Sequence, residues 1–175
     1  RTNRPYWWIQ ALVQAMTNTD LRAFLDLKHG GEPLSEQNIA AFEAQTSLGM
    51  PKEYRWFLTQ VSNGGFPGNM RFFPVHNIDD SDLSWCSLHG LYGLHTESLA
   101  FDLWDSWDIR HMILGAVAYP IGYDDGDSTL CIRLDTGFVD QIWYCPWGEG
   151  KDADSGGPRL YFVAKTLSEF WMALK

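Results

Sequence analysis

The sequence predicts a single α+β domain over residues 1–175, with a mixed or antiparallel central sheet flanked by N-terminal helices and a C-terminal helix. Its length, and its content of 45% hydrophobic and 15% aromatic residues, suit one globular domain with a sizeable core. Apolar residues recur at helical spacing in the first third of the chain and again at its end. Between these regions short apolar runs alternate with turns, and this order of elements is typical of α+β proteins.

The first third of the chain is expected to hold helices. Residues 6–28 are expected to be helical, with a break near residues 17–19 that can start a second helix, within an N-terminal extension that covers residues 1–33. Ser35 is a favoured N-cap for the next helix, because its hydroxyl can accept a hydrogen bond from an unpaired N–H group of the first turn. That helix is expected to bury Ile39 and Phe42, which lie on one side of it.

The stretch MPKEYRWFLTQVSNGG, residues 50–65, predicts a short amphipathic helix with an abrupt end. Pro51 suits its first position, because proline has no N–H group to leave unpaired there. The residues of its apolar face are Tyr54, Phe57, Leu58 and Val61. Asn63-Gly64-Gly65 can adopt the left-handed backbone that ends a helix. We therefore expect this segment to belong to the scaffold.

The central part of the chain predicts strands and one further helix. Residues 71–75 are expected to form a strand, followed by an acidic loop over 76–84 and by a strand or turn over 88–94. Residues 97–112 predict a helix whose inward side holds Leu99, Leu103 and either Trp107 or Trp104. Its outer side is expected to hold Asp102, Asp105 and Asp108. Like charges at this spacing repel, so they should face solvent or a partner.

The remaining strands are expected at residues 113–119, 128–134, 138–144 and, at a sheet edge, 160–163. A hairpin turn at residues 135–137 would place Cys131 opposite Gln141, so that Cys131 does not pair with Cys145. The Gly-rich acidic stretch 146–158 is expected to be a loop. Thr166 and Glu169 form a capping box for a final helix. The residues of that helix expected to face inward are Leu167, Phe170, Trp171 and Leu174.

The negative charge of the chain is concentrated in one region. The net charge is −9, and residues 79–154 hold three basic and fifteen acidic residues, a balance of −12. Such a surface disfavours nucleic acid, whose binding depends on Lys and Arg contacts to phosphates. It favours a basic partner, whose approach an acidic field would steer, although an acidic surface can also serve solubility alone.

The sequence favours neither a metal site nor an enzyme. Asp124-Asp125-Gly126-Asp127 resembles a cation loop, but no Glu follows at the spacing of a calcium loop, and Asp-Gly is also a favoured hairpin turn. The five histidines and three cysteines form no metal-binding spacing. Motifs for a serine nucleophile, a phosphate-binding loop or a zinc protease are absent from the sequence. We expect no cofactor and no membrane span, and an odd number of dispersed cysteines favours the reducing cytoplasm.

A family resemblance rests on several motifs that occur in a fixed order. These motifs are Leu34-Ser35, Ile39, Phe42-Glu43, Leu48-Gly49-Met50-Pro51, Tyr54-Arg55, Phe57-Leu58, Asn63-Gly64-Gly65, Leu91-Tyr92-Gly93-Leu94, Ala118-Tyr119-Pro120-Ile121-Gly122, Leu130-Cys131-Ile132, Val139, Ile142-Trp143-Tyr144 and Thr166-Leu167-Ser168-Glu169-Phe170. Together they resemble the SUKH superfamily, which comprises fungal cell-wall assembly regulators and many bacterial toxin immunity proteins. The resemblance covers residues 34–175. Met50 departs from the usual Leu, a change that conserves volume.

The resemblance implies a non-enzymatic protein that binds and neutralises a cognate toxin, often a nuclease or another nucleic-acid-targeting effector. The alternative that it leaves open is an intracellular regulatory adaptor, and a small hydrolase or metal-binding protein is a third reading. Oligomeric state is left open. The carboxylates expected to contact the partner are Asp102, Asp105, Asp108, Asp124, Asp125, Asp127, Glu149, Asp152 and Asp154. The aromatic anchors expected beside them are Trp104, Trp143 and Trp147.

Overall fold

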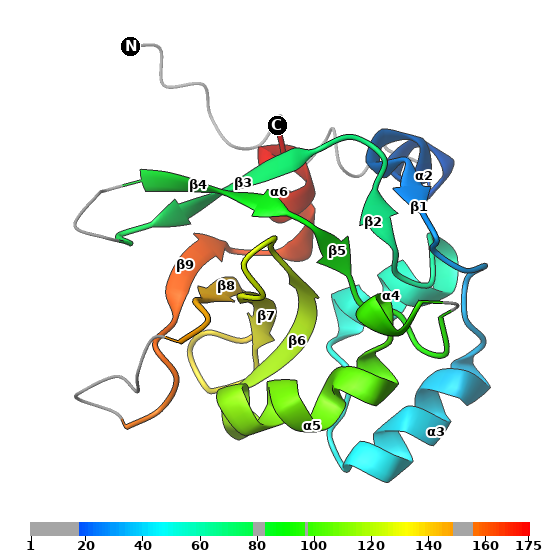
Figure 1. Ribbon diagram of the computed structural model, residues 1–175. Helices are drawn as coiled ribbons and strands as arrows, with labels where there is room; N and C mark the ends of the chain where they lie inside the picture. Colours follow the sequence, from blue (N-terminus) through cyan, green and yellow to red (C-terminus); the bar gives the residue numbers. More distant parts are fainter. Residues whose placement is uncertain (1–17, 79–82, 97, 149–155) are drawn as a thin grey trace.

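Helices lie before, between and after the strands of the computed structural model, which describes residues 18–78, 83–96, 98–148 and 156–175 (Figure 1). In chain order its elements are α2 (Asn18–Leu25), β1 (Leu27–Lys28), α3 (Glu36–Thr46), α4 (Lys52–Gln60), β2 (Phe66–Pro67), β3 (Arg71–His76), β4 (Leu83–Leu88), β5 (Gly90–Leu91), the 3-10 turn η1 (Leu99–Phe101), α5 (Leu103–Leu114), the 3-10 turn η2 (Gly115–Val117), β6 (Ala118–Tyr123), β7 (Thr129–Arg133), β8 (Ile142–Cys145), β9 (Tyr161–Ala164) and α6 (Leu167–Ala173).

Five antiparallel strands form the main sheet in the order β5-β6-β7-β8-β9, so β9 is an edge strand as predicted. Strands β3 and β4 pair in a separate antiparallel ribbon, and β1 pairs with β2. Helix α5 lies along β6, while α6 packs against β3 and β9. In Figure 1 the β3–β4 ribbon and α5 lie on opposite sides of the main sheet. The predicted α+β class is confirmed.

The two faces of the main sheet have different neighbours. Leu130 and Ile132 of β7 belong to the large core that contains the buried residues of α3, α4 and α6. Cys131 points to the opposite face, because successive side chains of a strand alternate. There it packs with Cys145 and with Leu114 at the end of α5. The C-terminal end of α5 therefore covers part of the outer sheet face.

The predicted N-caps of α3 and α6 and the predicted apolar face of α4 are confirmed. The predicted ends of α4 are corrected, because the helix begins at Lys52 after Pro51 as its N-cap and ends at Gln60, before Asn63-Gly64-Gly65. Ser35 caps α3, and its Oγ accepts a hydrogen bond from the backbone N–H of Asn38. The face of α4 predicted to be apolar is buried throughout. Thr166 caps α6 by accepting from the N–H of Glu169 at 3.1 Å, and the Glu169 carboxylate accepts from the N–H of Lys165. Local capping chemistry was thus sufficient to locate these helices.

The Asn63-Gly64-Gly65 segment follows α4 and forms hydrogen bonds with β5, the first strand of the main sheet, and with Leu94 just after it. The side-chain amide of Asn63 donates to the carbonyl of Leu94 and accepts from its N–H, both at 2.7 Å. Gly65 and Leu91 exchange backbone hydrogen bonds of 3.0 and 2.8 Å. Gly64 has φ +72°, and a Cβ atom there would lie 2.5 Å from the backbone nitrogen of Gly93. Only glycine fits such a close backbone crossing.

The predicted register of the β7–β8 hairpin is wrong. Cys131 lies opposite Trp143, and the return strand begins at Ile142 rather than at Phe138. Two successive turns replace the single turn, because Phe138 donates to the carbonyl of Asp135 and Gln141 donates to the carbonyl of Phe138. The expectation that Cys131 is not bonded to Cys145 still holds, since neither cysteine forms a disulfide. Burial raises the pKa of the Cys131 thiol, with a smaller effect from Cys145.

Other sequence-based boundaries also need correction. Leu83–Leu88 is a complete strand, where an acidic loop was expected up to residue 84. The segment expected as a strand from residue 113 begins with the last turn of α5 and η2. Leu99, expected to face inward, is exposed because the regular helix begins only at Leu103. Helix α2 ends at Leu25 before the short strand β1, and the expected helix over residues 6–17 lies outside the described residues.

Candidate partner-binding surface

Asp102 does not lie on the outer side of α5 with the other two carboxylates, which corrects the expectation. It precedes the helix as its N-cap and is only 4% exposed. Its two carboxylate oxygens accept from the backbone N–H groups of Trp104 and Thr96, each at 2.9 Å. A carboxylate at this position satisfies N–H groups that the first helical turn leaves unpaired. Asp102 therefore fixes where α5 begins.

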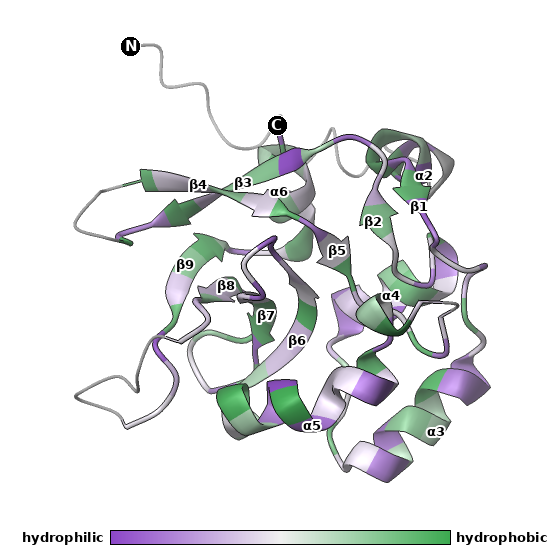
Figure 2. Ribbon diagram, viewed as in Figure 1, coloured by the Kyte–Doolittle hydropathy of each residue, from purple (hydrophilic) through white to green (hydrophobic). Residues whose placement is uncertain are grey.

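Asp105 and Asp108 are exposed on the outer side of α5, and they share it with two apolar residues that the sequence reading missed. Ile109 is 51% exposed and Met112 is 78% exposed. Residues 105, 109 and 112 follow the i, i+4, i+7 spacing of one helical face. Figure 2 shows hydrophilic and hydrophobic residues alternating along α5, with the hydrophobic ones gathered at its C-terminal end. The same helical spacing in the sequence could have revealed both apolar residues.

Asp124, in the turn between β6 and β7, is also buried rather than displayed. Its carboxylate accepts from the backbone N–H groups of Gly126 and Ser128, each at 2.9 Å, and from the hydroxyl of Tyr144 at 2.5 Å. Burial, together with this bond to an acidic neighbour, raises the pKa of Tyr144. The carboxylate of Asp124 is thus occupied in closing the turn. Asp125 and Asp127 of the same turn remain exposed.

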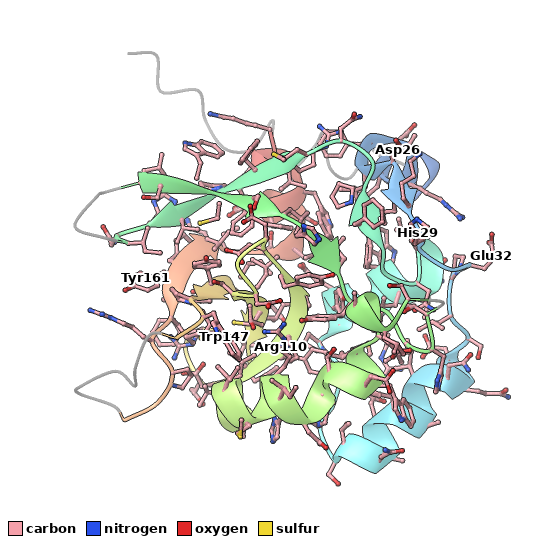
Figure 3. All side chains as sticks on the ribbon, viewed as in Figure 1. Asp26, His29, Glu32, Arg110, Trp147 and Tyr161 are labelled. Atoms are coloured by element: carbon pink, nitrogen blue, oxygen red, sulfur yellow. The ribbon has the colours of Figure 1, made fainter. Side chains whose placement is uncertain are left out.

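Arg110 ties α5 to this turn. Its side chain is buried, and its Nη1 donates to the carbonyl of Asp127 at 2.7 Å and to the hydroxyl of Thr129 at 3.2 Å. Its Nη2 lies 3.8 Å from the Asp127 carboxylate. The guanidinium carbon lies 5.9 Å from the ring centroid of Trp147, and Figure 3 shows the two side chains together above α5. One buried cation therefore holds three separate segments in a fixed arrangement.

The three tryptophans predicted as exposed anchors differ in their surroundings. Trp147 is 56% exposed, as expected for an anchor. Trp104 is half-buried against Phe42, with their ring centroids 5.3 Å apart. Trp143 is half-buried beneath the guanidinium group of Arg133, at 4.8 Å. Trp104 and Trp143 are thus engaged in packing, and Trp147 is the tryptophan of this set that offers most of its surface.

We define the α5 surface as the exposed residues that these contacts bring onto and beside α5: Asp105, Asp108, Ile109, Met112, Asp125, Asp127 and Trp147. The predicted contact residues Glu149, Asp152 and Asp154 lie outside the described residues. In the described ranges, no group of three His, Cys, Asp or Glu side chains is placed to hold a metal ion. No helix in the described part of the chain has the length and apolar character needed to cross a bilayer.

The antiparallel main sheet with flanking helices is the α+β architecture expected from the order of the motifs in residues 34–175. The family model described as the SMI1 / KNR4 family (SUKH-1) matches residues 33–172, most of the chain. The chain therefore belongs to the SMI1 / KNR4 (SUKH-1) family. Proteins of this family are generally non-enzymatic immunity or regulatory proteins, and the family suggests a protein partner such as a toxin. No curated protein matches the chain.

Proposed function

We propose that this protein is a bacterial immunity protein that acts in the cytoplasm, where it binds and neutralises a cognate secreted toxin through the α5 surface. The observation that carries the proposal is the exposure of Asp105, Asp108, Asp125 and Asp127 on segments that Arg110 holds together. Family membership supports the role, since the family includes immunity proteins. The toxin class that fits best is a nuclease or another effector that acts on nucleic acid, because its own substrate-binding surface needs to be basic.

The electrostatics of the α5 surface suit rapid recognition of such a partner. Exposed carboxylates within about one Debye length of one another, about 8 Å at physiological ionic strength, act together on an approaching cation. Such fields raise association rates by steering the encounter, more than they raise final affinity. An immunity protein must capture its toxin before the toxin reaches its target, so a fast association step is useful. The acidic surface supports this reading and disfavours direct binding to nucleic acid.

The proposal predicts that the gene directly upstream encodes a toxin domain, and the experiment that tests the proposal uses that domain. That domain is co-expressed with the wild-type chain or with the double variant Asp105→Lys/Asp108→Lys, and cell survival is counted. The control is Glu32→Lys/Glu36→Lys, which changes the net charge equally at exposed carboxylates and in addition breaks their ion pairs with Arg22 and Arg55. Glu32 lies across the molecule from Trp147 in Figure 3. We expect the wild type and the control to protect the cells, and the α5 variant to lose protection.

Each outcome has a distinct meaning. Loss of protection in the α5 variant alone supports both the immunity role and the surface. Equal protection by all three proteins would keep the immunity role but refute the surface. Failure of the wild type to protect, combined with recovery of many weakly bound proteins from the native cell and no stoichiometric one, would favour the alternative of a regulatory adaptor.

A further inference from the structure

We infer that the α5 surface contains an apolar anchor site, centred on Met112 and Ile109, that receives a hydrophobic side chain from a basic segment of the toxin. This inference rests on the proposed function and specifies the chemistry of the contact. Ile109 and Met112 are large, exposed apolar side chains on the same helical face as Asp105. Carboxylates alone would suffice for solubility. Exposed apolar side chains that adjoin one another and a groove are a feature of protein-interaction sites.

A groove begins at Met112. It has a volume of about 460 Å³, and its wall on the α5 side consists of Met112, Ile113, Leu114, Gly115 and Val117. The other lining residues are Cys145, Gly156, Gly157, Pro158 and Arg159. This volume falls within the range of about 300–1,000 Å³ that is typical of ligand pockets, so a large side chain can enter it. Met112 stands at the edge of the groove, where an unbranched, polarisable side chain can adapt to an incoming group.

A second hollow of about 280 Å³ adjoins the groove and leads to the exposed tryptophan. Its lining includes Trp147 and Thr129, and it shares Ile113 and Cys145 with the groove. The two hollows thus lie side by side about Ile113 and Cys145, with Met112 lining the first and Trp147 the second. The backbone N–H of Trp147 donates to the hydroxyl of Ser128 at 3.0 Å, and its ring contacts the Arg110 guanidinium. A rigid aromatic side chain beside an apolar hollow is a common composition for an interface hot spot.

The exposed carboxylates of α5 favour a basic protein segment as the occupant, because Asp108 lies about one helical turn before Met112. Among the described residues that line the two hollows, the one charged residue is Arg159, so the cations of the segment are expected at the carboxylates and its apolar side chain in the groove. Asp105 and Asp108 lie on the same face of α5, so a second copy of this chain would bring like charges together. A nucleic acid or an anionic membrane would meet the same repulsion. A segment with Lys or Arg beside a large apolar residue satisfies both parts of the surface. Its cations pair with the carboxylates, and its apolar side chain enters the groove.

The two parts of the contact should act on different rate constants. Exposed carboxylates at the rim mainly change the association rate and its dependence on salt. Apolar contacts that are desolvated on binding mainly change the dissociation rate. The variants Met112→Glu and Met112→Ala test the apolar part, and Asp105→Asn/Asp108→Asn tests the charged part. Met70→Glu is the matched control, because Met70 is 72% exposed and directly precedes β3. Figure 1 shows β3 on the other side of the main sheet from α5.

The experiment measures association and dissociation of the purified upstream-encoded toxin domain on immobilised full-length protein. We expect Met112→Glu to weaken binding by at least about tenfold through faster dissociation, as truncation at an interface hot spot does. Met112→Ala should cause a smaller loss, and Met70→Glu should bind like the wild type. The Asn double variant should slow association and flatten its salt dependence. Unchanged dissociation for Met112→Glu would overturn the inference while leaving the immunity role intact, whereas failure of the wild type to bind would overturn both.

Discussion

Replacing Gly64 by alanine should destabilise the protein more than replacing Gly148, a glycine with a similar backbone conformation, by alanine. Gly64 has φ +72°, and a Cβ atom there would lie 2.5 Å from the nitrogen of Gly93, 2.7 Å from the carbonyl carbon of Tyr92 and 2.8 Å from the carbonyl oxygen of Leu91. All three atoms belong to the backbone. They cannot move aside as the end of a flexible side chain can, so the two chain segments must separate.

The magnitude has two parts. A left-handed backbone costs a non-glycine residue about 1–2 kcal/mol. Separation of the segments also weakens the two backbone hydrogen bonds between Gly65 and Leu91, which have a net value of about 0.5–1.5 kcal/mol each. We therefore expect Gly64→Ala to lower the free energy of unfolding by about 2–5 kcal/mol, a large share of the ~5–15 kcal/mol typical of a folded domain.

Gly148 supplies a matched control. Its φ is +78°, and an added Cβ atom would meet nothing within 4 Å. Gly148→Ala should therefore show the backbone cost alone, and the difference between the two variants isolates the contact. Urea unfolding followed by tryptophan fluorescence gives both free energies. In thermal unfolding, each kcal/mol should lower the midpoint by about 2–4 °C for a chain of this size. Equal destabilisation by the two substitutions would refute the reasoning.

Two further predictions concern single side chains. Asn63→Ala leaves the buried N–H and carbonyl of Leu94 without their 2.7 Å partners. It should therefore lower the free energy of unfolding, measured by urea titration, by about 2–4 kcal/mol. A loss below about 0.5 kcal/mol would mean that water replaces the amide. The hydrogen bond from Arg133 holds the pKa of Asp135 below its ordinary value. A carboxyl group whose pKa is lowered by folding stabilises the folded state at pH values above its ordinary pKa of about 3.9. This contribution is lost as the pH falls through the lowered pKa of the folded state. The stability advantage of the wild type over Asp135→Asn should therefore shrink between about pH 5 and pH 2, and an advantage independent of pH would contradict this assignment.

The parts of the fold that sequence predicted well are those with local physical causes. Ser35 caps α3 and Thr166 caps α6, because each cap involves residues three positions apart in the sequence. The buried face of α4 follows from periodicity alone. The hairpin register failed because a turn signal at Asp135 does not reveal a second turn that ends at Gln141. Pairing over such a connection depends on contacts that are distant in sequence.

In the candidate site, too, features with local causes were predictable and contacts between distant parts of the chain were not. Sequence reasoning treated every aspartate of the acidic region as equivalent. Asp102 and Asp124 each precede a segment with unpaired backbone N–H groups, and this position recruits their carboxylates into capping and turn closure. Arg110 was not predicted as a connecting residue, because its partner Asp127 lies on a different element. The apolar residues Ile109 and Met112 were predictable from the spacing of α5.

The two buried aspartates contribute to binding through the surface that they position. Asp102 sets the start of α5, and Asp124 closes the turn that presents Asp127 to Arg110. The segments that carry the exposed carboxylates are thus fixed before a partner arrives. Association costs conformational entropy for every group that becomes ordered on binding, and a preorganised surface avoids part of that cost. Removal of a buried aspartate should therefore impair binding indirectly, by disordering the α5 surface, whereas removal of an exposed aspartate should act on the encounter itself.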